Sequence, residues 1–174
     1  MSKKKVLKEI IEQRKSSYPK DFSDKKIKDK VVQKILDSAE FTPNHKRTKP
    51  WRFEVFQDER KSELAKEFLK CYASNADNPA LIEKKLQSID EKFSQSNAII
   101  TISVNYSEKV PQWEELAATA MAVQNMYLTC TVENVGCYWS TPKEAEYLKE
   151  FLNLEDNQMC LGLFYMGKLL KIKN

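Results

Sequence analysis

The stretch "WEELAATAMAVQNMYLTCTVEN", residues 113–134, is the segment around which the rest of the chain has to pack. It is rich in alanine, methionine and leucine on most sides of a helix. An ordinary surface helix has one apolar face, whereas a helix that is apolar nearly all round lies buried in a core or an interface. The sequence therefore predicts a long buried helix, covered by the rest of the chain and by a second copy of it.

Apolar segments on either side of this helix predict strands. Residues 97–106 ("NAIITISVNY") are nearly continuously apolar and β-branched, which is typical of a strand covered on both faces. Apolar and charged side chains alternate in residues 51–56 ("WRFEVF"), which also indicates a strand. Two further strands are expected at "GCYW" (136–139) and "MCLGLFYMG" (159–167).

Several other segments predict helices. Ile10 and Ile11 fall on the apolar face of the first, and Ser23 is a suitable N-cap for the second. Because the helices are uneven and several precede the first strand, we expect an α+β fold in a single domain over residues 1–174. The expected helices span Lys3–Arg14, Asp24–Glu40, 58–74, 79–93 and 142–152.

Composition indicates a globular protein of a reducing compartment. The chain has 174 residues, of which 41% are hydrophobic and 31% charged. No stretch approaches the roughly 20 apolar residues of a membrane span, and no signal peptide is recognisable, so we expect a cytoplasmic protein. The four cysteines form no C-x-x-C pair and are expected to be buried free thiols. With one histidine, a zinc site is not expected.

Charge and glycine content restrict the possible ligands. The formal net charge is +4, but the lysines are scattered among acidic residues. This pattern favours a solvated surface over a nucleic-acid-binding face, and it also suits a small anionic ligand. Only three glycines occur, and neither common glycine-rich phosphate loop is present. A bound nucleotide would therefore need side chains to hold its phosphate.

Arg14, Lys15 and Ser16, at the end of the expected first helix, are the first candidate binding residues. An arginine fork beside hydroxyl groups can hold a phosphate without a glycine loop. The alternative is a cation that complements the negative end of the helix dipole. Taken alone, the local sequence favours the alternative.

The loop "FTPNHKRTKPWRF", residues 41–53, contains two prolines and the single histidine. Thr42 and Lys49 precede the prolines, which keeps both residues away from helical backbone angles. Asn44 and His45 can each donate and accept hydrogen bonds from this constrained backbone. Since no nucleophile motif accompanies them, they either belong to a binding site or form an exposed turn.

Polar groups at two other places also need an explanation. Gln124 and Asn125 interrupt the apolar helix, so each needs a partner from the other, from a ligand or from a second subunit. Trp139, Ser140 and Thr141 end a short strand. They either flank a planar cofactor or form a core tryptophan followed by a turn.

These motifs, in this order, resemble the nitroreductase family, and in particular its short FMN-dependent NAD(P)H nitroreductases. The motifs are "RKSS", "TPNHKRTKPWRFEV", "PQWE" at the start of the long helix, "VGCYWS" and "CLGLFYMG". The resemblance covers nearly the whole chain. It implies an α+β sandwich with an antiparallel-rich sheet, which forms a homodimer with two FMN sites at the interface.

The resemblance also implies which residues contact FMN: Arg14, Lys15, Ser16, Phe41, Asn44, His45, Trp139, Ser140 and Thr141. The first three would hold the phosphate and ribityl chain, the next three would approach from the loop, with His45 reaching across the dimer, and the last three would lie beside the cofactor. The implied reaction takes hydride from NAD(P)H at flavin N5 and passes electrons to a nitroaromatic, quinone or similar acceptor. The cofactor carries this chemistry, so no catalytic side chain is expected.

The chain departs from many family members in three places. Tyr18-Pro19-Lys20 and Ser140 stand where many relatives carry a further arginine. The chain also ends at "LLKIKN", so the C-terminal arm that embraces the partner in many members is expected to be short. Two other functions stay open: a flavin-binding protein without turnover, and a small basic nucleic-acid-binding domain.

Overall fold

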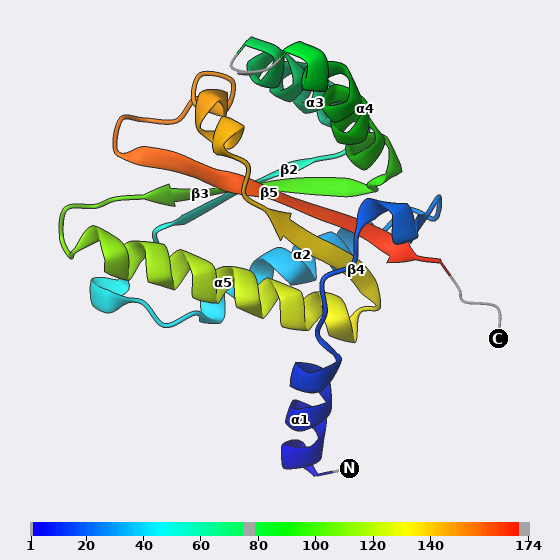
Figure 1. The fold of residues 1–174 in the computed structure, drawn as a ribbon. Coiled ribbons are helices and arrows are strands. Elements are labelled where there is room, and N and C mark those ends of the chain that lie inside the picture. Colours follow the sequence, from blue (N-terminus) through cyan, green and yellow to red (C-terminus); the bar gives the residue numbers. More distant parts are fainter. Residues whose placement is uncertain (1, 75–78, 171–174) are drawn as a thin grey trace.

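The structure, a computed structural model, describes residues 2–74 and 79–170 of the chain (Figure 1). The five strands of these residues form one antiparallel sheet in the order β1–β5–β3–β2, and β4 also pairs with β5. The expected α+β class and antiparallel sheet are confirmed. The strands are β1 (Phe22–Ser23), β2 (Trp51–Phe56), β3 (Ala98–Asn105), β4 (Val135–Ser140) and β5 (Gln158–Leu169).

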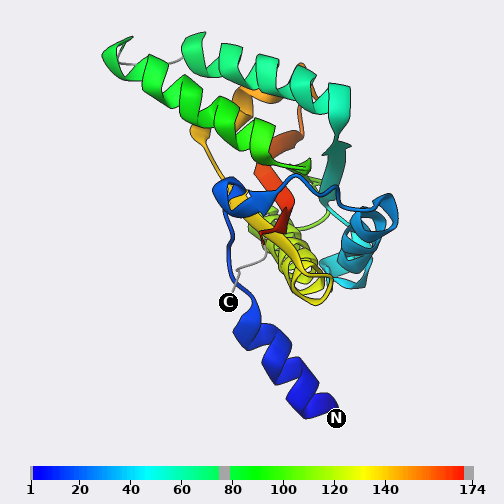
Figure 2. The same ribbon diagram turned by 90° about the vertical axis from the view of Figure 1, so that its right-hand side faces the viewer.

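Helices cover both faces of the sheet (Figure 2). One face packs against α2 and α5, and the other packs against α3, α4 and the 3-10 helix η4. The α-helices are α1 (Lys3–Gln13), α2 (Asp29–Ser38), α3 (Asp58–Ser74), α4 (Pro79–Gln95) and α5 (Gln112–Val132). The 3-10 helices are η1 (Pro19–Asp21), η2 (Ala39–Phe41), η3 (His45–Arg47) and η4 (Lys143–Leu148).

The central strands are buried on both faces, as the continuous apolar run in β3 predicts. Ile100 and Ile102 belong to the core beneath α2 and α5, whereas Ile99, which directly precedes Ile100, belongs to the core beneath α3 and α4. Phe164 and Leu163 of β5 divide between the two cores in the same way. Successive side chains of a strand point to opposite faces, so each strand contributes to both cores.

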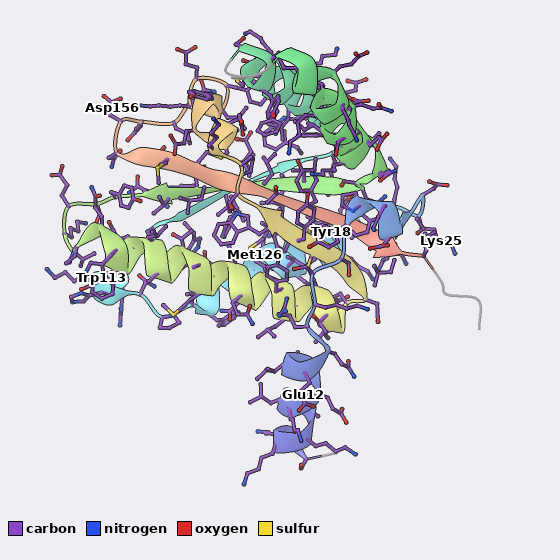
Figure 3. The ribbon with its side chains drawn as sticks, in the orientation of Figure 1. Glu12, Tyr18, Lys25, Trp113, Met126 and Asp156 are labelled. Carbon is purple, nitrogen blue, oxygen red and sulfur yellow. The ribbon has the colours of Figure 1, made fainter. Side chains whose placement is uncertain are left out.

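Helix α5 is buried on one side only. Ala122, Met126 and Cys130 are fully buried against the sheet, and Figure 3 shows Met126 between α5 and the strands. On the outer side, Trp113 is 69% exposed and Met121 is 43% exposed. The prediction of a helix buried nearly all round is therefore confirmed only for the inner side within one chain.

Helix α1 projects away from the rest of the chain (Figures 1 and 2). None of its residues is buried, and its Leu7 and Ile11 are 57% and 52% exposed. An isolated helix of 11 residues is marginal in water, because most helical stability in proteins comes from packing of an apolar face. The apolar face of α1 is thus present, as predicted; α1 approaches α5, but none of its side chains is buried there.

Two predicted helices differ from the observed elements. The second helix begins at Asp29 rather than Asp24, because residues 22–23 form β1 at the edge of β5. The Ser23 hydroxyl donates to the Lys168 carbonyl oxygen at 3.0 Å instead of capping the helix. The segment expected as a helix over 142–152 forms the shorter 3-10 helix η4, followed by turns.

The expectation about the cysteines is confirmed. Cys71, Cys130, Cys137 and Cys160 are buried free thiols. Among residues 2–74 and 79–170, no helix combines the length and apolarity needed to cross a bilayer. The same residues contain no cluster of three or more His, Cys, Asp or Glu side chains placed to hold a metal ion.

Gly162 permits the close approach of β4 to β5. Its φ angle is +137°, and a Cβ atom at this position would lie 2.1 Å from the Ser140 carbonyl oxygen. It also lies at an irregularity in the β3–β5 register, where Ile102 pairs with Gly162 but Ser103 pairs with Cys160. A β-bulge of this kind re-aims the strand beside it.

We predict that Gly162→Ala lowers the free energy of unfolding by about 1–3 kcal/mol, because alanine is strained at this φ angle and meets backbone atoms. Gly136→Ala is the matched control, since a Cβ atom there mainly meets the flexible Leu169 side chain and the edge of Phe22. Chemical denaturation of both variants measures the difference. An equal loss of unfolding free energy in the two variants would contradict the special role of Gly162 in the approach of β4 to β5.

Candidate functional site

The segment that follows α1 connects this helix to the end of the sheet. Ser17 is buried, and its backbone N–H donates to the Cys137 carbonyl oxygen of β4 at 2.9 Å. This bond fixes the chain just after Arg14, Lys15 and Ser16. Lys15 and Ser16 are exposed and Arg14 is half-buried, so all three side chains are accessible to a ligand.

Arg14 lies over an aromatic ring and keeps its donors free. Its guanidinium carbon is 5.3 Å from the centre of the Tyr127 ring on α5. No carboxylate in the described part of the chain forms an ion pair with Arg14. A guanidinium that stacks on a ring can still present its N–H fork to a phosphate. The arrangement therefore favours anion binding over the alternative of a cation that only complements the dipole of α1.

Tyr127 links this segment to β4, and sequence reasoning missed it. Its hydroxyl accepts a hydrogen bond from the Trp139 backbone N–H at 2.7 Å, and its ring meets Phe164 edge-on. Burial raises the pKa of Tyr127, and the Ser16 hydroxyl opposes part of this rise. The signal available in the sequence was a tyrosine in an otherwise apolar helix, whose hydroxyl needs a partner when buried.

The end of β4 places Trp139, Ser140 and Thr141 beside the Arg14 segment. Trp139 is half-buried, and its indole Nε1 is buried without a hydrogen-bond partner among the described residues. An unpaired buried donor costs free energy unless a ligand or another subunit satisfies it. Ser140 is half-buried and lines a small cavity, and Thr141 is exposed. The structure thus brings Arg14, Lys15 and Ser16 together with the predicted strand end.

The loop that carries Asn44 and His45 lies at the other end of α5. His45 Nδ1 is 2.6 Å from Glu114 Oε2 at the start of that helix. Because a carboxylate only accepts, this contact places a proton on Nδ1 and directs Nε2 away from the helix. Phe41 is 84% exposed. These side chains are available to a partner, as the prediction requires, but they are remote from Arg14.

The same loop is braced internally. The Asn44 amide donates to the Thr42 carbonyl oxygen at 3.1 Å and accepts from the Lys49 N–H at 2.9 Å, so it holds the turn together. Lys46, Arg47 and Lys49 all have positive φ angles, which are costly for residues other than glycine. Such strain persists only where the surroundings enforce it, and it is frequent at functional sites.

Asn125 is paired within the chain, which answers the question raised by the amides of α5. It donates to the Ser38 carbonyl oxygen at 3.2 Å and to the Thr42 hydroxyl at 3.0 Å. Gln124 is exposed on the outer side of the helix. Asn125 therefore positions the start of the loop relative to α5, and no ligand is needed to explain it.

The two groups of predicted residues lie near opposite ends of α5. Glu114, which holds His45, and Tyr127, which contacts Arg14, are separated by 13 residues of the same helix. At 1.5 Å of rise per residue, this separation is about 20 Å along the helix axis. Within one chain, the loop of Asn44 and His45 is therefore separated from the Arg14 segment by most of the length of α5.

Comparison with known proteins agrees with this architecture. A model of the Nitroreductase family matches residues 11–168. YfhC of Bacillus subtilis (strain 168), provisionally named as an NAD(P)H nitroreductase, is 26% identical over 167 residues, which cover 93% of this chain and 84% of that protein.

Solved structures show the same fold. A nitroreductase-like family protein from Bacillus cereus superposes with a TM-score of 0.82 at 23% identity, covering 97% of this chain and 88% of the other. NfnB of Mycobacterium smegmatis, an FMN-dependent nitroreductase in complex with NADPH, gives a TM-score of 0.76 at 12% identity. The match covers 97% of this chain and 89% of NfnB. A nitroreductase with bound FMN from Bacteroides fragilis NCTC 9343 gives a TM-score of 0.73 at 19% identity. The match covers 97% of this chain and 93% of the other.

The family match spans nearly the whole chain, from the end of α1 to the end of β5. It includes both groups of predicted residues and the helix α5 that separates them. By this match, the protein belongs to the nitroreductase family.

Proposed function

We propose that this protein is an FMN-dependent oxidoreductase that takes reducing equivalents from NAD(P)H and delivers them to a nitroaromatic, quinone or similar acceptor. The carrying observation is the group of accessible cations beside the end of β4: the exposed Lys15 and the half-buried Arg14, whose guanidinium stacks on Tyr127 and has no ion-pair partner among the described residues. Family membership, and the FMN and NADPH in related structures, support the choice of ligands.

The donor set fits FMN. Arg14, Lys15 and Ser16 supply two cations and a hydroxyl for the phosphate and ribityl chain, in a protein that has no glycine-rich phosphate loop. Trp139, Ser140 and Thr141 would border the ring system. When bound, FMN supplies the hydride and electron transfer chemistry, so the protein need only bind, orient and shield it.

The overall reaction balances without a protein nucleophile. For a nitroaromatic acceptor, NAD(P)H and one proton reduce the nitro group to a nitroso group, and one water molecule is released. The two electrons come from the nicotinamide. Arg14 and Lys15 would neutralise the phosphate, and the Tyr127 hydroxyl would hold the Trp139 backbone in place through the 2.7 Å hydrogen bond.

The proposed active unit is a homodimer in the cytoplasm. The separation of about 20 Å along α5 between the two residue groups supports a role for Phe41, Asn44 and His45 at the FMN held by the other chain. The apolar outer side of α5 and the unpartnered apolar face of α1 supply surface for such a contact. Four buried free thiols are in keeping with a reducing compartment.

His45 would act as a positioning group in this dimer. Glu114 fixes the ring orientation through the 2.6 Å contact at Nδ1, so Nε2 is left to hydrogen-bond a cofactor or a substrate. The Glu114 side chain is itself only partly exposed.

The purified protein is expected to bind FMN and, once loaded, to oxidise NAD(P)H in the presence of an acceptor. A single open site must serve nicotinamide and acceptor in turn, so the initial rates should give parallel lines in double-reciprocal plots. A protein that stays colourless and does not quench FMN fluorescence at micromolar concentration would contradict the proposal. A yellow protein that consumes no NAD(P)H with any acceptor would instead indicate flavin binding without turnover.

Arg14→Ala is expected to weaken FMN binding by roughly ten- to a hundredfold, because a hydrogen bond to a charged phosphate contributes about 1.5–3 kcal/mol. Arg60→Ala is a matched control, since Arg60 also stacks on an aromatic ring, 4.8 Å from the centre of Phe56, but lies on α3. Fluorescence titration gives both affinities, and melting of the flavin-free proteins reports stability. A loss of stability in Arg14→Ala with unchanged FMN affinity would show that Arg14 only complements the dipole of α1.

Mixed dimers test whether the two groups come from different chains. His45→Ala and Arg14→Ala each damage both sites of their own homodimers. A heterodimer of one chain of each, purified through two different tags, should have one intact site and one doubly damaged site. It is expected to bind one FMN per dimer with near wild-type affinity. Two equally weakened sites would mean that both groups act within the same chain.

A further inference from the structure

The first turn of α5 carries an exposed tryptophan. Trp113 belongs to the motif "PQWE", residues 111–114, and its side chain is 69% exposed. Figure 3 shows it at one end of the helix. Among the described residues, its ring has no aromatic or cation–π partner. Tryptophan is highly buried on average, so this exposure indicates a partner outside the single chain.

The helix start that carries Trp113 is firmly held from within the chain. Glu115, two residues further on, is only 1% exposed. Its carboxylate accepts hydrogen bonds from the Ser107 hydroxyl at 2.6 Å and from the Ser107 backbone N–H at 2.9 Å. These bonds tie the first turn of α5 to the segment that follows β3, so the position of Trp113 does not depend on a ligand.

The same helix start is joined to the loop that carries His45. Glu114 lies directly after Trp113, and its Oε2 is 2.6 Å from His45 Nδ1. The ammonium group of Lys46 donates to the Lys109 carbonyl oxygen, just before the helix, at 2.9 Å. The loop and the helix start therefore form one braced unit, and any surface that His45 approaches is also approached by Trp113.

Trp113 lies on the outer side of α5. It shares an exposed stripe with Leu116, Ala120 and Gln124, whose spacing of three or four residues places them on one helix face. Ala122, on the opposite face, is fully buried against the sheet side. The outer side is the one proposed to receive a second chain. Trp113 thus faces that chain at the end of the helix where the His45 loop lies.

We infer that Trp113 forms the aromatic wall of the site shared by nicotinamide and acceptor, and that it stacks a planar aromatic acceptor against the FMN held by the other chain. This inference rests on the proposed function, which places His45 at that FMN. Aromatic pairs gain free energy beyond the burial of area, and a side chain on a pre-organised turn loses little conformational freedom when it binds. Trp113 therefore favours planar aromatic acceptors over acceptors of other shapes.

The acceptor test compares 4-nitrobenzamide, which has a ring to stack, with ferricyanide, which has none. In a ping-pong cycle, kcat/KM for an acceptor reports only its reaction with the reduced enzyme. Trp113→Ala is expected to lower kcat/KM for 4-nitrobenzamide about tenfold relative to that for ferricyanide, because only the ring uses the indole. Trp113→Phe should retain most of the preference. An unchanged ratio in Trp113→Ala would overturn the inference.

Leu116→Ala is the matched control, because Leu116 is exposed on the same outer side one turn further along α5. It should leave the ratio of the two kcat/KM values unchanged. Sedimentation measures the dimer in both variants. If Trp113 only packs against the second chain, Trp113→Ala will weaken the dimer and lower the rates with both acceptors equally, which would overturn the stacking role. An equal change of the ratio in Leu116→Ala would overturn it as well.

A binding measurement without turnover separates this inference from the proposed function. Benzamide is titrated calorimetrically into the FMN-loaded protein in the absence of NAD(P)H. Trp113→Ala is expected to weaken its binding about tenfold, and Leu116→Ala to leave it unchanged. Trp113-dependent benzamide binding in a protein that oxidises no NAD(P)H would refute the proposed turnover and leave the stacking site standing. Normal NAD(P)H oxidation with benzamide binding that ignores Trp113 would refute the stacking role alone, and a failure to bind FMN would refute both.

Discussion

The pairing of β5 with strands on both of its edges is the constraint on which the rest of the structure depends. β5 holds β4 along one edge and β3, followed by β1, along the other, and its side chains divide between two cores. Gly162 lets β4 approach closely enough for this pairing to continue to Ser140. The position of the Trp139–Ser140 strand end, and so of the candidate site, follows from that approach.

Helix α5 divides the site into two parts. Its inner side completes the core, while Tyr127 near one end meets Arg14 and Glu114 near the other meets His45. At 1.5 Å of rise per residue, the helix places Glu114 and Tyr127 about 20 Å apart along its axis. A site that needs both groups is therefore incomplete in one chain, and the exposed apolar outer side of the same helix is suited to receive a second chain.

The chemistry of the site matches a protein whose cofactor does the reaction. The described residues show cations, hydroxyls and an unpaired indole N–H near the strand end, and the small cavity that Ser140 lines is also lined by two lysines, Lys85 and Lys92. Groups of these kinds are suited to bind or orient an anionic or planar ligand. The low glycine content is consistent with this design, since side chains take the place of a glycine-rich phosphate loop.

Sequence periodicity was sufficient to determine β2, β3, β5, the long helix and the α+β class, because each of these elements is specified by local spacing of apolar residues. The family resemblance placed the Arg14 and Trp139 segments in one site. Local sequence did not predict that Ser23 belongs to β1, since its partner Lys168 is 145 residues away. Nor did it show that the Asn125 amide donates hydrogen bonds to Ser38 and Thr42. It also did not show that the Tyr127 hydroxyl lies between Ser16 and β4. The cavity that Lys85 and Lys92 line together with Ser140 was likewise not predicted. These relations depend on contacts between segments distant in sequence, which only the packing of helices on the sheet brings together.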